Sequence, residues 1–261
     1  MTECVDNPAE RLHALLLEFC RVAKELGPNS RNWDAWARAM AFEGPAFSAG
    51  SADFFRCFSE AMQLPVKVRE AVTATVPDPL HRDYLLGPLS SIDLAFQASS
   101  NPGNPISQVW LHFNNGDTAS SAAIYSLLGC SNELRRAQVE AGLTEADGHS
   151  LTAMINDLVE AVIASDLEHA DKQFLLPRLN EMLVAVQQAR LRGRYPVEAA
   201  VDAGQGALLR RPNLIQRMRD AQLFDSVVTF FNKVNTVLAL AGQTEQLAQN
   251  TMHAIERGFG G

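Results

Sequence analysis

The sequence predicts an all-α protein, a compact multi-helix bundle of roughly nine to twelve helices arranged as one domain or as two packed helical halves. Apolar residues recur at helical spacing along most of the chain, and residues that begin or end helices separate these stretches. Strand character is strong only from Ser226 to Phe231, and the apolar residues there continue at helical spacing to Ala241. The composition, 47% hydrophobic and 20% charged, is typical of a globular protein.

Three helices are expected in the first part of the chain. Asn7-Pro8 combines a capping residue with a helix-starting proline, and Gly27-Pro28 ends the apolar stripe that follows. A shorter helix is expected from about Trp33 to Met40. Ser51 caps a third helix, which we expect Leu64-Pro65 to close, because proline disrupts a helix interior. The apolar faces of the first and third helices comprise Leu12, Leu15, Leu16, Phe19, Val22 and Leu26, and Phe54, Phe55, Phe58 and Met62.

The middle of the chain is poor in charge. Asp78-Pro79 begins another helix, which Gly87-Pro88 interrupts. From Leu94 to Asn132 the only charged residue is Asp117, so we expect this segment to be buried against the rest of the protein or against a partner. A boundary near Gly129–Asn132 would give an N-terminal helical half, residues 1–130, and a C-terminal helical half, residues 131–261.

Further helices are expected in the C-terminal half. Thr144 and Asp166 are suited to cap two of them, and Gly193 ends the second, which Pro177 should kink or divide. Pro196 begins the next helix. Pro212-Asn213 separates that helix from a buried one over Leu214–Ala241, and a last helix is expected from about Thr244 to Arg257.

A local pattern occurs mainly within residues 150–211. The acidic turn Ser165-Asp166-Leu167-Glu168 precedes a leucine-rich helix, then Arg190-Leu191-Arg192-Gly193 and a short alanine-rich helix. The pattern resembles uncharacterised all-helical proteins encoded in bacterial accessory and defence-associated loci. This resemblance implies an all-helical fold and a bacterial setting, and no chemistry.

Charge changes sign in the second half of the chain. Residues 140–171 hold eight acidic residues and no Lys or Arg, whereas residues 172–219 hold nine basic residues against three acids. We take Arg190, Arg192, Arg194, Arg210 and Arg211 as candidate ligands for a protein partner or an anion, since arginine pairs well with carboxylates and phosphates. Neutralisation of these arginines by the acids of neighbouring helices is the alternative.

The acids Asp166, Glu168 and Asp171, together with His169, have side chains that suit a hard metal ion or acid–base chemistry. Carboxylates at a helix start are also favoured by the helix dipole, so helix capping is the competing interpretation, and contact with a partner a third. No phosphate loop, dinucleotide fingerprint or nucleophile elbow occurs, and the four cysteines are too widely spaced for a zinc knuckle. We therefore expect no cofactor.

These observations favour a non-enzymatic interaction or regulatory protein that binds a protein partner or forms a homo-oligomer. A net charge of −8 argues against nucleic acid as the partner, and a cytoplasmic location follows from the absence of a secretory signal. One alternative is a membrane-active effector that inserts the segment 223–241, although Asp225 and Lys233 would be costly within a bilayer. The other is a metal-dependent enzyme that uses the carboxylates of residues 166–171.

Overall fold

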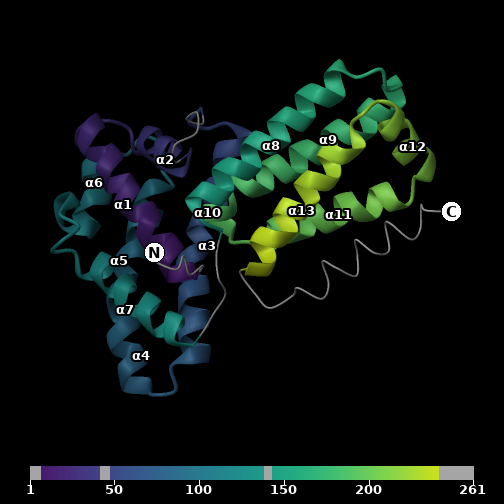
Figure 1. Ribbon diagram of the computed structural model, residues 1–261. Coiled ribbons are helices and arrows are strands. Elements are labelled where there is room, and N and C mark those ends of the chain that lie inside the picture. The colour runs from purple at the N-terminus through teal and green to yellow at the C-terminus, as the bar shows by residue number, and fades with distance from the viewer. Residues whose placement is uncertain (1–6, 42–47, 138–142, 241–261) are drawn as a thin grey trace. The chain divides into compact units, whose positions relative to one another are not determined.

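The computed structural model describes residues 7–41, 48–137 and 143–240 (Figure 1). Within these ranges it contains eleven α-helices of eight residues or more and no strand, which confirms the predicted all-α class and the predicted number of helices. The chain divides into two compact units, Val5–Val139 and Glu140–Gly261. Helix α7 runs through the predicted boundary region at Gly129–Asn132.

The N-terminal unit is built around its first helix, which packs against α2, α3 and α7. Its helices are α1 (Pro8–Leu26), α2 (Asn32–Ala41), α3 (Ala52–Thr75), α4 (Pro79–Leu86), α5 (Ser90–Ser99), α6 (Ile106–Trp110) and α7 (Ala122–Arg136), with 3-10 turns η1 (Gly87–Leu89) and η2 (Leu111–Gly116). The side chain of Asn7 caps α1 by accepting the Glu10 N–H at 2.9 Å, as predicted. Its Nδ2 donates to Ser131 Oγ of α7 at 3.2 Å, and both residues are buried.

Helix α3 corrects one prediction. It begins after its Ser51 cap as expected but continues through Pro65 to Thr75. Proline in a helix interior costs about 3 kcal/mol, and burying large apolar side chains offsets this at roughly 1.5–3 kcal/mol each. Val68 and Val72, one and two turns beyond the proline, are both fully buried. The predicted apolar face was also too broad, because Phe55 is exposed.

Aromatic rings fill the centre of this unit. The ring of Trp36 stacks on Phe19 at 4.1 Å and on Phe96 at 5.2 Å between centroids. Its Nε1 donates to Ser99 Oγ at 2.9 Å, which satisfies the one polar atom that the indole carries into the core. The indole therefore joins α1, α2 and α5 in a single packed centre.

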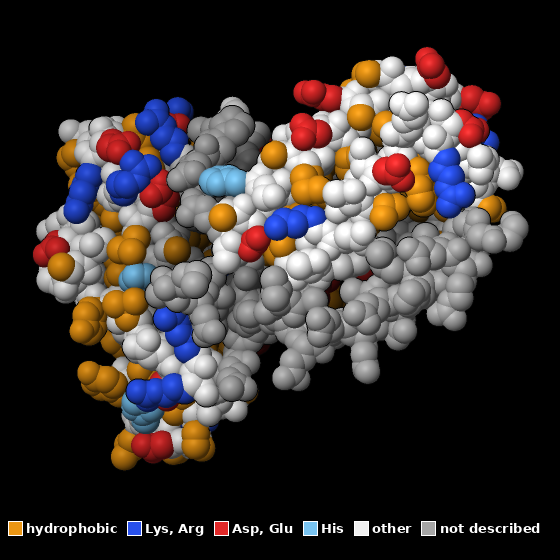
Figure 2. All heavy atoms as spheres, viewed as in Figure 1, with side chains coloured by type: hydrophobic (Ala, Val, Ile, Leu, Met, Phe, Trp, Pro, Cys, Tyr) orange, Lys and Arg blue, Asp and Glu red, His pale blue; other side chains and the backbone are white. Residues whose placement is uncertain are grey.

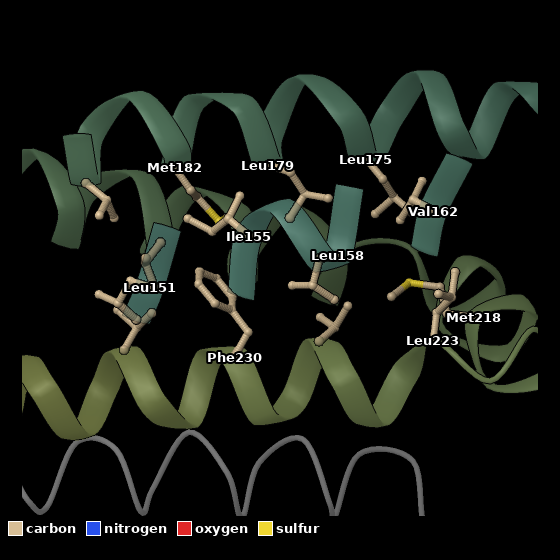
Figure 3. Packing of buried hydrophobic residues seen from close by; sticks show 14 of the residues in the cluster. Leu151, Ile155, Leu158, Val162, Leu175, Leu179, Met182, Met218, Leu223 and Phe230 are labelled. Carbon is tan, nitrogen blue, oxygen red and sulfur yellow. The ribbon is translucent and has the colours of Figure 1, made fainter. Parts of the chain in front are cut away.

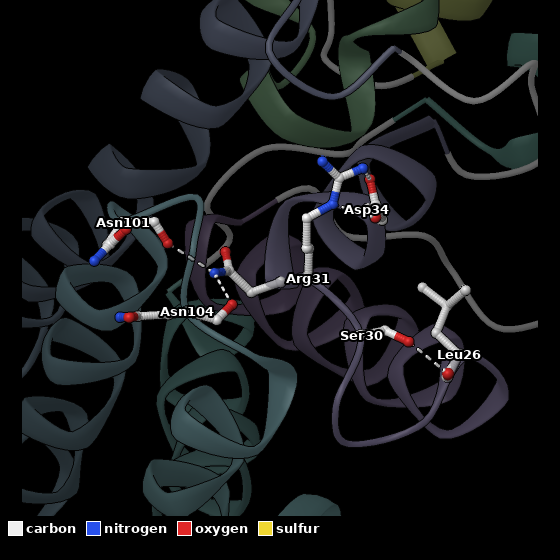
Figure 4. Close-up of polar contacts among 7 residues, drawn as sticks. Leu26, Ser30, Arg31, Asp34, Asn101 and Asn104 are labelled. Atoms are coloured by element: carbon white, nitrogen blue, oxygen red, sulfur yellow. Dashed lines mark hydrogen bonds and ion pairs between the residues drawn. The ribbon is translucent and has the colours of Figure 1, made fainter.

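A polar clamp fixes the loop after α5. The fully buried side chain of Asn32 donates from Nδ2 to the carbonyl oxygens of Asn101 at 2.9 Å and Asn104 at 2.7 Å (Figure 4). The Ile106 N–H donates to the Ser30 carbonyl at 2.9 Å on the same side of the loop. The Asn32 backbone N–H also donates to the Asn104 carbonyl, at 3.2 Å, so one residue of α2 holds this loop through three hydrogen bonds.

The C-terminal unit comprises α8 (Glu145–Ala164), α9 (His169–Gln187), α10 (Ala189–Arg192), α11 (Tyr195–Leu209), α12 (Pro212–Asp220) and α13 (Phe224–Leu240). Thr144 caps α8 as predicted. The predicted Asp166 cap is wrong, because α9 begins at His169. Leu167 is buried in the connecting turn, and Lys172 Nζ donates to the carbonyls of Ile163 and Ser165 at the end of α8.

The single helix predicted over Leu214–Ala241 is two helices. Gln222 adopts a left-handed conformation at φ 59°, and α12 ends there in a Schellman turn. The Leu223 N–H donates to the Met218 carbonyl at 2.8 Å and the Gln222 N–H to the Arg219 carbonyl at 3.0 Å. Both Met218 and Leu223 are buried, so the apolar contact that accompanies this turn stabilises it. The helix predicted from Thr244 lies outside the described residues.

The core of this unit lies between α8, α9 and α13. Figure 3 shows Leu151, Ile155 and Leu158 of α8 among the side chains of the other two helices. Helix α11 approaches α9 so closely that a Cβ atom added to Gly204 would lie 2.0 Å from Met182 Cε. Helix α9 itself continues through Pro177.

Candidate functional site

The predicted basic residues lie on three segments of the C-terminal unit. Arg192 is half-buried in α10, and Arg194 pairs with Glu198 at 3.1 Å in the first turn of α11. Arg210 and Arg211 are exposed at the turn between α11 and α12. Arg190 belongs to α10, but its side chain lies outside the described part of the chain.

Two guanidinium groups gather around one aromatic ring near the α11–α12 turn. Arg178 and Arg211 each lie over the Phe174 ring at 3.8 Å from its centroid. Arg178 also donates to the Phe174 carbonyl at 2.8 Å. Stacking on a ring leaves the in-plane N–H donors of a guanidinium able to bind an anion. The structure thus places Arg211 on the same aromatic ring as Arg178, an arrangement that the sequence did not indicate.

The acidic residues of the predicted metal site do not converge on one point. Asp171, whose side chain is only 5% exposed, accepts from Arg217 Nε at 2.5 Å and from its terminal nitrogen at 2.8 Å. The hydrogen bonds to Asp171 raise the pKa of Arg217. Asp166, Glu168 and His169 are exposed, and no group of three or more potential ligands in the described ranges could hold a metal ion. Asp171 therefore joins α9 to α12.

The segment proposed for membrane insertion forms an amphipathic helix. In α13 one side is buried through Val227, Phe230, Val234 and Val237, whereas Asp225 and Ser226 are exposed. Among the described residues, no helix combines the length and the apolar character needed to cross a bilayer.

Helices α4 and α7 of the N-terminal unit carry four exposed apolar side chains, and Leu111 of η2 is exposed as well. Leu80 is 79% exposed and Tyr84 80% on α4, while Tyr125 is 68% and Leu128 42% exposed on α7. We call these four residues the α4–α7 surface. Figure 2 shows hydrophobic side chains gathered at the edge of this unit where α4, α5 and α7 lie. The charge-poor segment is thus partly exposed.

Four contacts hold α4 against α7. The Leu85 carbonyl accepts hydrogen bonds from the Ser126 hydroxyl and, at 3.7 Å, from Cys130 Sγ. A Cβ atom on Gly129 would lie 3.0 Å from the Leu85 side chain, so the two helices approach closely. His81 Nε2, one turn earlier on α4, lies 3.6 Å from Glu133, one turn later on α7. The helices are therefore antiparallel.

Helix geometry puts Leu80, Tyr84 and Tyr125 on one outer face, and Leu128, three residues after Tyr125, borders it. Tyr84 directly precedes Leu85, and Tyr125 directly precedes Ser126, so each lies about 100° around its helix from the contact line. In an antiparallel pair these two rotations point to the same side, which is solvent because the other side carries buried Leu127 and Leu134. Leu80, one turn from Tyr84, continues the ridge.

No protein-family model, curated protein or solved structure matches this chain.

Proposed function

We propose that this chain is a non-enzymatic interaction protein that binds a protein partner through the α4–α7 surface. The observation that supports the proposal is the exposure of two tyrosines and two leucines on the adjacent helices α4 and α7, each between 42% and 80%. Taking about 200 Å² for a large side chain, the exposed area of the four is roughly 500 Å². This is near the upper end for the largest apolar patch of a monomeric protein, and such patches are commonly binding sites.

Tyrosine is well suited to such a surface. It has a large rigid ring, two side-chain torsions and a phenol that can hydrogen-bond at an interface rim, so ordering it on binding costs little entropy. Tyr84 and Tyr125 are the two most exposed aromatic side chains of the N-terminal unit among the described residues. Leu80 and Leu128 flank them and enlarge the apolar area that a partner would cover.

The surface is also rigid before binding. The hydrogen bonds to the Leu85 carbonyl and the close approach at Gly129 fix α4 on α7, and Leu127 and Leu134 anchor α7 in the core. A preformed surface loses little conformational entropy when its partner arrives. The preformed surface therefore supports the proposal that it binds a partner.

We further propose that the protein is encoded in a bacterial accessory or defence locus and acts in the cytoplasm. The cluster of Arg178 and Arg211 on Phe174 offers a secondary contact for an acidic segment of the partner. Neither a membrane-inserted effector nor a metal-dependent enzyme draws comparable support from the described residues.

Photo-crosslinking tests this function in the native host. A photoreactive amino acid is placed at Tyr84, at Tyr125 or, as the matched control, at Tyr195, which is 74% exposed on α11 of the other unit. We expect one discrete protein adduct from the first two positions and none from the control. Equal or absent adducts at all three positions would contradict the proposed function.

A further inference from the structure

We infer that a cluster around Phe174 in the C-terminal unit binds an acidic peptide segment. The Phe174 cluster consists of the ring of Phe174 on α9 and the guanidinium groups of Arg178 and Arg211, each 3.8 Å from the ring centroid. Because it lies in the other unit, this site goes beyond the α4–α7 surface and does not depend on it. The chemistry of the ligand follows from unpaired positive charge, restrained guanidinium groups and an uncapped helix start.

The cluster carries positive charge that no acid in the described ranges neutralises. Arg210, next to Arg211 at the turn between α11 and α12, is exposed and adds a third guanidinium group to this region. Among the described residues, no carboxylate forms an ion pair with Arg178, Arg210 or Arg211. The charge of these three arginines is therefore left to solvent or to a ligand.

The nearby acids of the same unit do not compensate this charge. Asp171, three residues before Phe174, is paired with Arg217 at 2.5 Å. Glu181 on α9 and Asp202 on α11 are exposed, and neither forms an ion pair within the described part of the chain. An external carboxylate is thus the natural counterion for the cluster.

The aromatic ring restrains the guanidinium groups before a ligand arrives. Stacking on a ring face orients the plane of a guanidinium and leaves its in-plane N–H donors available. Arg178 is held further by the 2.8 Å hydrogen bond that it donates to the Phe174 carbonyl. A carboxylate can accept two parallel hydrogen bonds from such a group, and a restrained arginine loses little entropy when it binds one.

The start of α12 offers a further contact for an anion. Arg211 directly precedes this nine-residue helix, and neither a capping side chain nor an acidic residue occupies its first turn. The N–H groups of Leu214 and Ile215 both donate to the Arg211 carbonyl. Pro212 has no N–H, so Asn213 supplies the remaining donor of this turn. The helix dipole favours negative charge at the same end.

The charge of the whole unit favours a short acidic segment over nucleic acid. Residues 143–240 hold twelve acidic and ten basic residues, a formal net charge of −2. A long polyanion would meet these carboxylates beyond the cluster, whereas a few carboxylates on a peptide need only the arginines. Figure 2 shows basic side chains beside hydrophobic ones at the end of this unit where α12 lies.

Fluorescence anisotropy of a labelled hexaglutamate peptide, titrated with the purified full-length chain at about 0.1 M salt, tests the site. We expect saturable binding with a dissociation constant below about 1 mM, raised about three- to tenfold by Arg211→Ala. The matched control is Arg219→Ala, which removes the same charge from the exposed arginine stacked on Phe224. It lies about 12 Å further along α12, beyond the Debye length of about 10 Å, so it should bind as the wild type does.

Two further arms separate this site from simple charge attraction. Arg211→Lys keeps the charge but lacks the planar fork and its stacking, so it should weaken binding about as much as Arg211→Ala. A labelled oligothymidylate of the same length should bind more weakly than the peptide. Circular dichroism spectra and thermal midpoints establish that each variant is folded.

Four results would overturn the inference: no saturable peptide binding, equal weakening by Arg211→Ala and Arg219→Ala, full binding by Arg211→Lys, or tighter binding of the oligonucleotide. Crosslinks at Tyr84 and Tyr125 report on the α4–α7 surface alone. Failure of the peptide site and failure of the proposed function are therefore seen separately.

Discussion

The close approach of α11 to α9 at Gly204 makes a sharp prediction about packing. A Cβ atom at this position would lie 2.0 Å from Met182 Cε, and Met182 is buried, so Gly204→Ala must displace a packed side chain. Gly206, two residues along the same helix, is the matched control, because its Cβ would meet only Arg210 at 3.6 Å, an ordinary contact.

The magnitude follows from two opposing effects. Replacing glycine by alanine inside a helix stabilises it by up to about 1 kcal/mol, so Gly206→Ala should raise the free energy of unfolding by nearly that amount. Gly204→Ala gains the same helix preference but adds overpacking of about 1–3 kcal/mol. We therefore expect Gly204→Ala to be less stable than Gly206→Ala by about 1–3 kcal/mol.

Urea denaturation followed by circular dichroism measures this difference. A second background, Met182→Val, removes the terminal methyl group that the new Cβ would meet, so there Gly204→Ala should become as favourable as Gly206→Ala. If Gly204→Ala stabilises the wild-type chain as much as its control does, or if its penalty persists with valine at 182, the packing argument is refuted.

Three further predictions concern polar and titratable groups in the two cores. Asn32→Ala removes the two hydrogen bonds that this buried side chain donates to the loop after α5, and it should lower the free energy of unfolding by about 1–3 kcal/mol, measured by urea titration. Amide exchange in residues 101–106 should become faster. Arg217→Ala should lower the thermal midpoint more than Asp171→Ala does. The first variant leaves the buried Asp171 carboxylate without its ion-pair partner, whereas in the second the half-exposed Arg217 can be solvated. A larger loss in Asp171→Ala would contradict this reasoning. Burial raises the pKa of the Cys20 and Cys130 thiols to about 11 from an ordinary 9.0. Because the folded-state pKa is the higher one, their contribution to stability is present below about pH 9 and lost as pH rises toward 11, a loss that Cys20→Ala/Cys130→Ala should reduce in pH-dependent melts.

Helix starts could be predicted because they depend on neighbouring residues. Asn7, Ser51 and Thr144 each accept the backbone N–H three residues later, the geometry that a capping side chain reaches by itself. Such contacts need no knowledge of the rest of the fold. The same holds for Gly193, whose positive φ ends α10 where the sequence placed a helix end.

Helix ends that depend on distant packing could not be predicted. Pro65 favours a break by local rules, but Val68 and Val72 continue the buried face of α3 and outweigh it. Gln222 lacks the usual signal for a left-handed turn, and only the burial of Met218 and Leu223 accounts for the end of α12. Both errors arise from tertiary contacts.

The candidate site was only partly visible in the sequence. The low charge of residues 94–132 predicted burial against the rest of the protein or against a partner. The structure shows that Tyr125 and Leu128 of this segment are exposed. The spacing of Leu80 and Tyr84 suits a core-facing stripe equally well, so only the packing of Leu85 on α7 reveals which side faces solvent. Among the basic residues, the position of Arg211 over Phe174 likewise required the fold.

The hydrogen bond between Asn7 and Ser131 has a consequence for folding during synthesis. It joins residues 124 positions apart, and α1 packs against α7 along the same line. At about 5–20 residues per second, a ribosome needs roughly 6–25 s to extend the chain across that interval. Throughout this time α7, the last helix that packs on the apolar face of α1, has not yet been made. We therefore expect the nascent N-terminal unit to expose this apolar face until α7 emerges, and a pause in translation before residue 122 to prolong that exposure.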